Sequence, residues 1–204
     1  AIDARLDRAD YVPIGHIAPD LQHAIVAVED RRFYEHHGFD MTGVARATLV
    51  NIQHGRIEEG ASTITQQLAK NLFLSDEQSL DRKLEEALLS LDLEMHYSKD
   101  EILELYLNTI YFGSGFYGIH EASVGYFGRE PHELDLPETS MLAGIPNAPS
   151  VYSPYVDFML AKKRQIVVLD AGRVSQVGLH AFAGGVRDLV AVVDVPVVEG
   201  EDLE

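Results

Sequence analysis

The sequence has no cysteine among its 204 residues, which excludes disulfide bonds and thiolate metal ligands. Basic residues are also scarce: 16 Lys and Arg stand against 33 Asp and Glu, and the net charge is −17. This balance argues against a nucleic-acid-binding surface. Apolar runs are short as well, because a stretch such as Ala24 to Val28 is far below the roughly 20 residues that cross a bilayer.

The composition that remains is typical of one globular domain, since 46% of the residues are hydrophobic and 24% are charged. Apolar residues recur at helical spacing through the first two thirds of the chain and strand signals are weak, so we expect a mainly α fold. The predicted helices cover residues 19–30, 63–72, 81–96, 98–113, 118–126 and 138–143. A valine-rich stretch, residues 186–198, could form a strand ahead of an acidic tail.

An anionic ligand bound by so acidic a chain needs a local cluster of cations. Half of the Lys and Arg residues fall into four short groups, and three of these groups flank unusual polar motifs. The groups are Arg31 with Arg32, Lys70, Arg82 with Lys83, and Lys162 to Arg164.

The first candidate site is the pair Glu29 and Asp30, which ends an apolar helical stretch. A carboxylate that emerges from apolar surroundings has a raised pKa and can act as a general base or acid near neutrality. The alternative is a solvated helix terminus whose carboxylates pair with Arg31 and Arg32. Taken alone, this motif favours the structural interpretation.

The second candidate is the segment from Gly60 to Gln67, which places small residues and hydroxyls at a helix N-terminus. Free backbone N–H groups and the helix dipole favour an anion there, and Lys70 could add charge. An ordinary capped helix is the alternative. Taken alone, Arg82 and Lys83 with Glu86 indicate a structural surface salt bridge at i, i+4 spacing, worth about 0.3 to 0.5 kcal/mol.

Four segments in order carry a resemblance to a known family. They are EDRRFYEHHGFD (29–40), GASTITQQLAKNLFL (60–74), RKLEEALLSLDLE (82–94) and KDEILELYLNTIYFGSGFYGIHEASVGYFG (99–128). Together they resemble the peptidoglycan glycosyltransferases, the family of monofunctional transglycosylases and of the N-terminal domain of class A penicillin-binding proteins. The resemblance covers about residues 11–168, and the sequence contains no transpeptidase motif.

The resemblance implies a lysozyme-like helical fold with a large head lobe and a small jaw lobe that contacts the membrane. In this chain the jaw would lie roughly between Met41 and Ile57. We therefore expect a glycosyltransferase domain over residues 1–168 and a C-terminal extension over residues 169–204. After Leu169 the usual helical stretch looks shortened, and the valine-rich tail matches no known pattern.

The implied reaction joins a lipid-pyrophosphate-linked glycan to the GlcNAc 4-hydroxyl of lipid II, with inversion and release of undecaprenyl pyrophosphate. The implied partners are lipid II, the lipid-linked nascent glycan, the membrane surface and other cell-wall synthesis proteins, and no nucleic acid. The expected location is the extracytoplasmic face of the bacterial plasma membrane, with an N-terminal transmembrane anchor that this chain does not include.

The resemblance also implies residue roles. Glu29 would be the general base, and Glu86 would stand near the donor pyrophosphate, where it assists departure or helps to hold a divalent cation, Mg²⁺ or Mn²⁺, bound mainly with substrate. Cationic side chains would stabilise the leaving group, namely Lys70, Arg82 and Arg164. The remaining substrate-binding or cleft-shaping positions would be Asp30, Phe33, His36, Ser62, Thr63, Gln67, Asn71 and Asn108. By analogy with inverting glycosidases, the two carboxyl groups should stand farther apart than the roughly 5 Å of retaining enzymes.

Two other functions remain open at this point. A lysozyme-like peptidoglycan hydrolase would share the fold and a catalytic glutamate, but it would not need the cations at Lys70 and Arg82. A non-catalytic lipid II binding module would be expected to lack Glu29 or Glu86, and both are present.

The strong negative charge predicts that such a domain binds membranes through an apolar jaw more than through a basic surface. Binding to vesicles should therefore change little when the fraction of anionic lipid is raised. Co-sedimentation with liposomes of increasing phosphatidylglycerol content measures this, and a steep rise in binding would contradict it.

Overall fold

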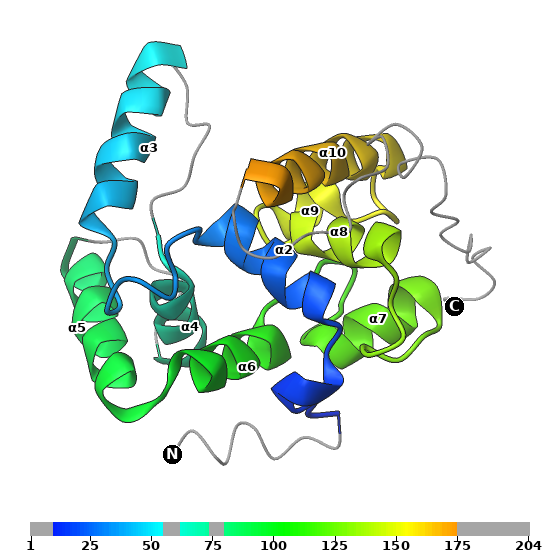
Figure 1. The fold of residues 1–204 in the computed structure, drawn as a ribbon, viewed down its shortest axis with the longest axis horizontal. Helices are drawn as coiled ribbons and strands as arrows, with labels where there is room; N and C mark the ends of the chain where they lie inside the picture. Colours follow the sequence, from blue (N-terminus) through cyan, green and yellow to red (C-terminus); the bar gives the residue numbers. More distant parts are fainter. Residues whose placement is uncertain (1–9, 55–61, 74–79, 175–204) are drawn as a thin grey trace, which may run out of the picture.

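The computed structural model describes residues 10–54, 62–73 and 80–174, and within these ranges the chain is mainly helical, as predicted (Figure 1). The elements are a 3-10 helix η1 (Ile14–His16), α2 (Pro19–Glu29), α3 (Met41–His54), α4 (Ile64–Phe73), α5 (Leu80–His96), α6 (Lys99–Thr109), α7 (Ile119–Phe127), α8 (Leu136–Gly144), α9 (Pro149–Tyr152) and α10 (Phe158–Val174). Extended pairing in the described ranges is limited to one isolated bridge between Tyr111 and Tyr117.

Helix α2 lies at the centre of the molecule and packs against α8 and α10 (Figure 1). Pro19 stands in its first turn, where a missing N–H has no cost, and Asp20 complements the helix dipole. Leu21 and Ile25 are completely buried, with Ala24 between them almost so. Fully burying a leucine or isoleucine side chain contributes about 1.5 to 3 kcal/mol, so this face fixes the helix and the direction in which Glu29 leaves it.

Helices α4, α5 and α6 form a second packed group, in which α4 contacts both of the others. Thr63 and Gln66 cap the start of α4 reciprocally: Thr63 Oγ1 accepts from Gln66 N at 3.1 Å, and Gln66 Oε1 accepts from Thr63 N at 3.0 Å. Ser98 and Glu101 form the same capping box at the start of α6. These caps satisfy backbone donors that a helix start leaves free.

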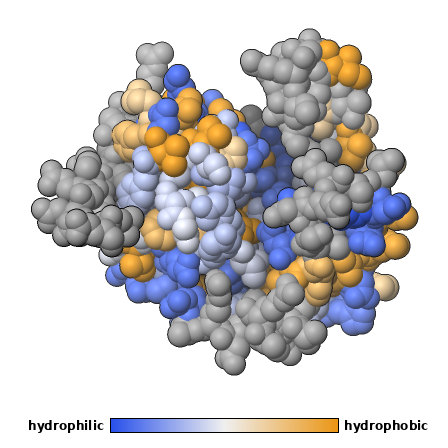
Figure 2. All heavy atoms as spheres, turned by 180° about the vertical axis from the view of Figure 1, so that it is seen from behind, coloured by the Kyte–Doolittle hydropathy of each residue, from blue (hydrophilic) through white to orange (hydrophobic). Residues whose placement is uncertain are grey.

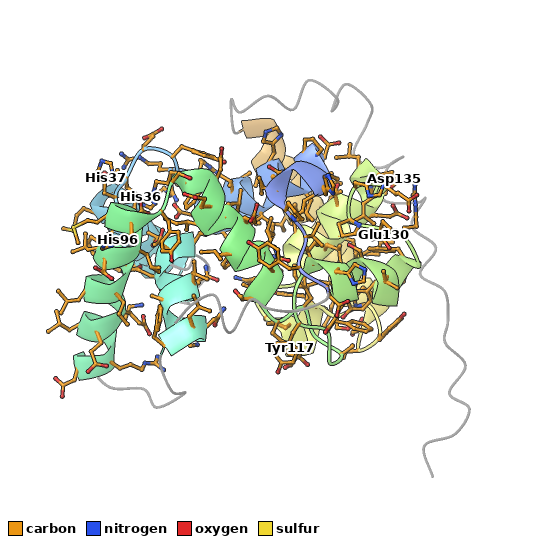
Figure 3. All side chains as sticks on the ribbon, turned by 90° about the horizontal axis from the view of Figure 1, so that it is seen from below. His36, His37, His96, Tyr117, Glu130 and Asp135 are labelled. Carbon is orange, nitrogen blue, oxygen red and sulfur yellow. The ribbon has the colours of Figure 1, made fainter. Side chains whose placement is uncertain are left out.

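Helix α6 ends at Thr109, four residues before the predicted end at Gly113. The chain turns there into a short hairpin, in which Phe112 N donates to Phe116 O and Phe116 N donates to Gly113 O. Tyr111 and Tyr117 stack across this hairpin with ring centroids 4.7 Å apart, and Tyr117 reaches the surface (Figure 3). The backbone hydrogen bonds of this hairpin take the place of those that a further turn of α6 would make.

Helix α10 was not predicted, although it is as long as α5. Its inner face mixes apolar and polar residues: Ala161, Val168 and Leu169 are buried, and so is Gln165. Gln165 Nε2 donates to Pro137 O at 2.7 Å and to Ser140 Oγ at 3.0 Å, which joins α10 to α8. The helix continues through position 168 to Val174. The predicted extension and the valine-rich stretch 186–198 lie almost entirely outside the described residues, and the domain division stays a prediction.

Helix α3 projects from one end of the molecule (Figure 1). Met41 and Ile52 on this helix are highly exposed. The predicted jaw begins here, while its last part, residues 55–57, lies outside the described ranges, and the division into two lobes stays a prediction. In the part of the chain that the structure describes, no helix is both long and apolar enough to span a membrane.

Viewed from behind, the surface is hollowed between α3 and the part that carries α10 (Figure 2). Hydrophilic residues line much of this hollow, whereas apolar residues gather on the outer surface beside it (Figure 2). The apolar residues near α9 and α10 include Val151, Val156 and Met159.

Gly118 and Gly115 offer a matched test of packing at the hairpin. Both have φ near +85°, but a Cβ at Gly118 would lie 2.7 Å from Asn108 O, and a Cβ at Gly115 would meet nothing within 4 Å. Gly115→Ala should cost about 1 to 2 kcal/mol of unfolding free energy through backbone strain. Gly118→Ala should cost about 1 to 3 kcal/mol more, because the backbone of α6 must also move. Urea unfolding measures both, and equal losses would contradict this packing.

Candidate active site

Glu29 is the last residue of α2, and its carboxyl group is buried although the residue as a whole is half-buried. Burial raises the pKa of Glu29 above that of an ordinary carboxyl group. The hydrogen bond from Gln67 and the charge of Arg164 lower this pKa, and the charge of Asp30 raises it. The net result is a raised pKa, which is the property that the apolar approach to Glu29 predicted.

A chain of hydrogen bonds orients this carboxyl group. Gln67 Nε2 donates to Glu29 Oε2 at 3.1 Å, and Tyr106 OH donates to Gln67 Oε1 at 3.0 Å. Tyr106 is completely buried, and burial followed by the charges of Glu29 and Asp30 raises its pKa well above the usual value for tyrosine. Tyr106 therefore stays a donor, and this fixes which end of the Gln67 amide faces Glu29.

Asp30 is buried and joins three segments of the chain. Its Oδ2 accepts from the backbone N–H of Ile64 at 3.0 Å, and both oxygens lie 2.9 Å from His36 Nε2. Thr63 completes the junction by donating from Oγ1 to Gly38 O at 2.7 Å. These bonds hold together the end of α2, the loop 31–40 and the start of α4. His36 lies toward one end of the molecule, and Glu130 lies at the opposite end (Figure 3).

Phe33 belongs to the same loop and is fully buried, so it packs in the hydrophobic core and exposes no surface to a ligand. The Lys99 ammonium lies 4.5 Å from the centroid of its ring. A cation at this distance contributes about 0.5 to 2 kcal/mol. Phe33 thereby helps to fix the loop that carries His36.

Glu86 is 2% exposed, and each of its oxygens is matched by a cation on the same helix. Lys83 Nζ lies 2.6 Å from Oε2, and Arg82 Nη2 lies 3.3 Å from Oε1. Lys83 also donates to Ser62 Oγ at 3.0 Å, which brings the start of α4 to this cluster. A buried carboxylate is tolerated when it is paired in this way.

A pocket of about 180 Å³ opens between these elements. Its lining includes Glu29 and two other predicted site residues, Ser62 and Gln67. Pro146 and Asn147, from the turn between α8 and α9, complete this part of the lining. The carboxyl group with the raised pKa therefore stands at the wall of a cavity, next to hydroxyl and amide groups that can bind a polar ligand.

The other predicted site residues are more dispersed. Lys70 and Asn71 lie on the last turns of α4, half-buried and exposed respectively. Arg164 lies on α10, half-buried, with its guanidinium 5.7 Å from the centroid of the Tyr152 ring. Asn108 lies on α6 and holds the N-terminal segment: its Oδ1 accepts from Val12 N and its Nδ2 donates to Val12 O, each at 2.8 Å.

The described residues contain no group of three His, Asp or Glu side chains that could hold a metal ion. Glu86, the predicted metal-contacting residue, has both oxygens engaged by Arg82 and Lys83. A divalent cation would therefore need phosphate oxygens from a ligand as its main donors, as Mg²⁺ commonly does.

Sequence reasoning missed two residues at this site, Tyr106 and Asn147. Both reach it through packing between distant segments, and no local pattern indicated their part. The pairing of Arg82 and Lys83 with Glu86 was considered from the sequence, and the structure shows both ion pairs.

Comparison with known proteins gives a clear family match. A model of the family described as Transglycosylase matches residues 2–172. Penicillin-binding protein 1A of Neisseria cinerea is 49% identical over 163 residues, which make up 80% of this chain and 20% of that protein. The same protein of Neisseria lactamica is 48% identical over the same shares. The chain thus spans about a fifth of the length of these relatives.

A relative of similar size gives the same result. A protein of Cupriavidus necator, provisionally named a transglycosylase, is 46% identical over 180 residues, which are 86% of this chain and 78% of that protein. The family match covers the helices that build the pocket, from α2 to α9 and most of α10. The chain belongs to the transglycosylase family.

Proposed function

We propose that this chain polymerises peptidoglycan glycan strands from lipid II. The observation that carries the proposal is the Glu29 carboxyl group, buried at the wall of the pocket with a raised pKa and held by Gln67. Membership of the transglycosylase family and similarity to penicillin-binding protein 1A support the substrate class. The chain transfers a lipid-pyrophosphate-linked glycan to the GlcNAc 4-hydroxyl of lipid II and forms a β-1,4 linkage.

Glu29 is the general base in this reaction. Its carboxylate accepts the proton of the 4-hydroxyl group while that oxygen bonds to the anomeric carbon of the donor. The bond from this carbon to the pyrophosphate oxygen breaks, and undecaprenyl pyrophosphate leaves with the electron pair. Attack from the opposite face inverts the centre without a covalent glycosyl-enzyme, and a positioned base supplies about 10² to 10⁴-fold in rate.

The leaving pyrophosphate develops negative charge, and nearby cations stabilise it electrostatically. Arg82 and Lys83 gather around Glu86, which keeps their charges in place on α5. Lys70 and Arg164 are the further candidates. A divalent cation, Mg²⁺ or Mn²⁺, would be held mainly by the pyrophosphate and would neutralise part of its charge, and Glu86 would be the residue that helps to hold it.

The same proposal places the chain at the extracytoplasmic face of the bacterial plasma membrane, where lipid II and nascent glycan are its partners. The exposed Met41 and Ile52 on α3 support contact with lipid at the predicted jaw. A lysozyme-like hydrolase is the second candidate, because a buried glutamate is also what a hydrolase uses. The cations around Glu86 favour a pyrophosphate leaving group over it.

Replacement of the base tests the proposal. Incubated with fluorescent lipid II in detergent with Mg²⁺ or Mn²⁺, the unaltered chain should give a ladder of long glycan on a gel, and Glu29→Gln should give none. The control Glu130→Gln, at the far end of the molecule, should keep the ladder (Figure 3). Fragments cut from finished glycan would instead support a hydrolase, and binding without a ladder from either chain would support a non-catalytic module.

The acid limb of the pH–rate profile tests how Gln67 acts on Glu29. The base works when ionised, so kcat/KM should rise with pH as Glu29 loses its proton. The hydrogen bond from Gln67 favours the carboxylate and lowers the pKa of Glu29, so Gln67→Met should move this limb to higher pH. Tyr106→Phe, which frees the Gln67 amide, should move it in the same direction by less. A limb unchanged in Gln67→Met would contradict this assignment.

A further inference from the structure

Gly144, the last residue of α8, lies directly against the side chain of Arg164 on α10. A Cβ built at Gly144 would lie 2.9 Å from Arg164 Cγ and 3.7 Å from Arg164 Cβ. Contacts under 3.0 Å are not seen for real Cβ atoms, so an alanine here would force something to move. The crowded atom is near the base of the arginine side chain, so a turn of its distal end would not relieve the contact.

The backbone of Gly144 gives no other reason for glycine at this position. Positive φ angles are found at other glycines, such as Gly113 and Gly118, but not at Gly144. In a right-handed helical conformation alanine is normally preferred to glycine. Glycine is therefore required at position 144 for a steric reason: a side chain there would collide with the stem of Arg164.

Arg164 is placed to act on Glu29. Helix α10 packs against both α8 and α2, and Arg164 is the cation whose charge lowers the pKa of Glu29. Its Nε is buried and has no hydrogen-bond partner among the described residues, and the same is true of Glu29 Oε1. The guanidinium is steadied by the Tyr152 ring at 5.7 Å.

The other groups that face Glu29 come from each neighbouring element. Asp30 follows it in the chain and disfavours its charge, and Gln67 of α4 favours it through a hydrogen bond. Tyr106 of α6 is neutral and bonds to Gln67. The acidic residue of α8, Glu138, pairs with Arg129 at 2.8 Å. Among the described residues, Arg164 of α10 is the cation whose charge favours the ionised form of Glu29.

We propose that Gly144 is a positioning residue: by leaving room for the stem of Arg164, it lets this side chain lie between α8 and α10 where its charge acts on Glu29, the proposed base. This assignment rests on the proposed function for its role in the reaction, while its physical half concerns Glu29 and Arg164 alone. Arg164 then has two parts in the proposed reaction: its charge lowers the pKa of Glu29, and it contacts the leaving pyrophosphate.

The test is a ¹³C NMR titration of the chain with labelled glutamate and without substrate. The resonance of Glu29 is assigned by its absence from Glu29→Gln. Arg164→Met keeps most of the side-chain stem and removes the charge, so the titration midpoint of Glu29 should move to higher pH. Arg164→Lys keeps a positive charge, so the titration midpoint of Glu29 should stay close to that of the unaltered chain. Gly144→Ala should also move the midpoint upward.

Matched controls separate this effect from general disturbance. Lys163→Met removes an equal charge from the exposed side of α10, and Gly15→Ala adds a methyl group where nothing lies within 4 Å. Both should leave the midpoint of Glu29 unchanged. In the double variant Gly144→Ala with Arg164→Met, the two shifts should not add, because the first acts through the second residue.

An unchanged midpoint in Arg164→Met would overturn the proposal, and so would a shift in Arg164→Met without one in Gly144→Ala. If Gly144→Ala fails to fold, the comparison of Arg164→Met with Arg164→Lys still decides whether the charge acts on Glu29. Because the titration needs no turnover, a missing glycan ladder would reject the proposed polymerase activity and leave this result standing. An expected shift in the titration together with an unmoved pH–rate limb would reject Glu29 as the base.

Discussion

The bonds to the Asp30 carboxylate are the constraint on which the site depends. One oxygen accepts from the first backbone N–H of α4, and the carboxylate also binds His36 in the preceding loop. A negative charge at a helix N-terminus is favoured by the helix dipole, so this contact stabilises both the helix start and the buried charge. Because Glu29 precedes Asp30 directly and Gln67 lies one turn into α4, the same junction sets the distance between the Glu29 carboxyl group and the Gln67 amide.

The electrostatics of the site differ from those of the whole chain. The chain is strongly acidic, yet Glu86 forms ion pairs with Arg82 and Lys83. The charge of Arg164 lowers the pKa of Glu29. The two glutamates therefore have different surroundings: Glu86 is paired with two cations, whereas Glu29 has only partial compensation for its burial.

The sequence predicted the parts of this arrangement that depend on local patterns. The apolar stretch of α2 that ends at Glu29 and the helical spacing of α4 and α5 are each contained in a few neighbouring residues. The end of α6 was misplaced, because pairing of Tyr111 with Tyr117 is not visible in helical periodicity. Helix α10 was missed because the buried Gln165 interrupts its apolar face, and its partners on α8 are 25 and 28 residues away. Tyr106 and Asn147 reach the site through tertiary packing, while the chemical roles of the site residues stay predictions.

The amide of Gln67 makes the two oxygens of Glu29 unequal. Tyr106 fixes the amide in one orientation, so Oε2 is occupied by a donor and Oε1 has no partner among the described residues. The carboxylate is thus desymmetrised before any ligand binds. In the proposed reaction, Oε1 is the oxygen that has no donor of its own and is left to accept a proton. The difference between the two oxygens depends on a phenol from a helix that does not line the pocket.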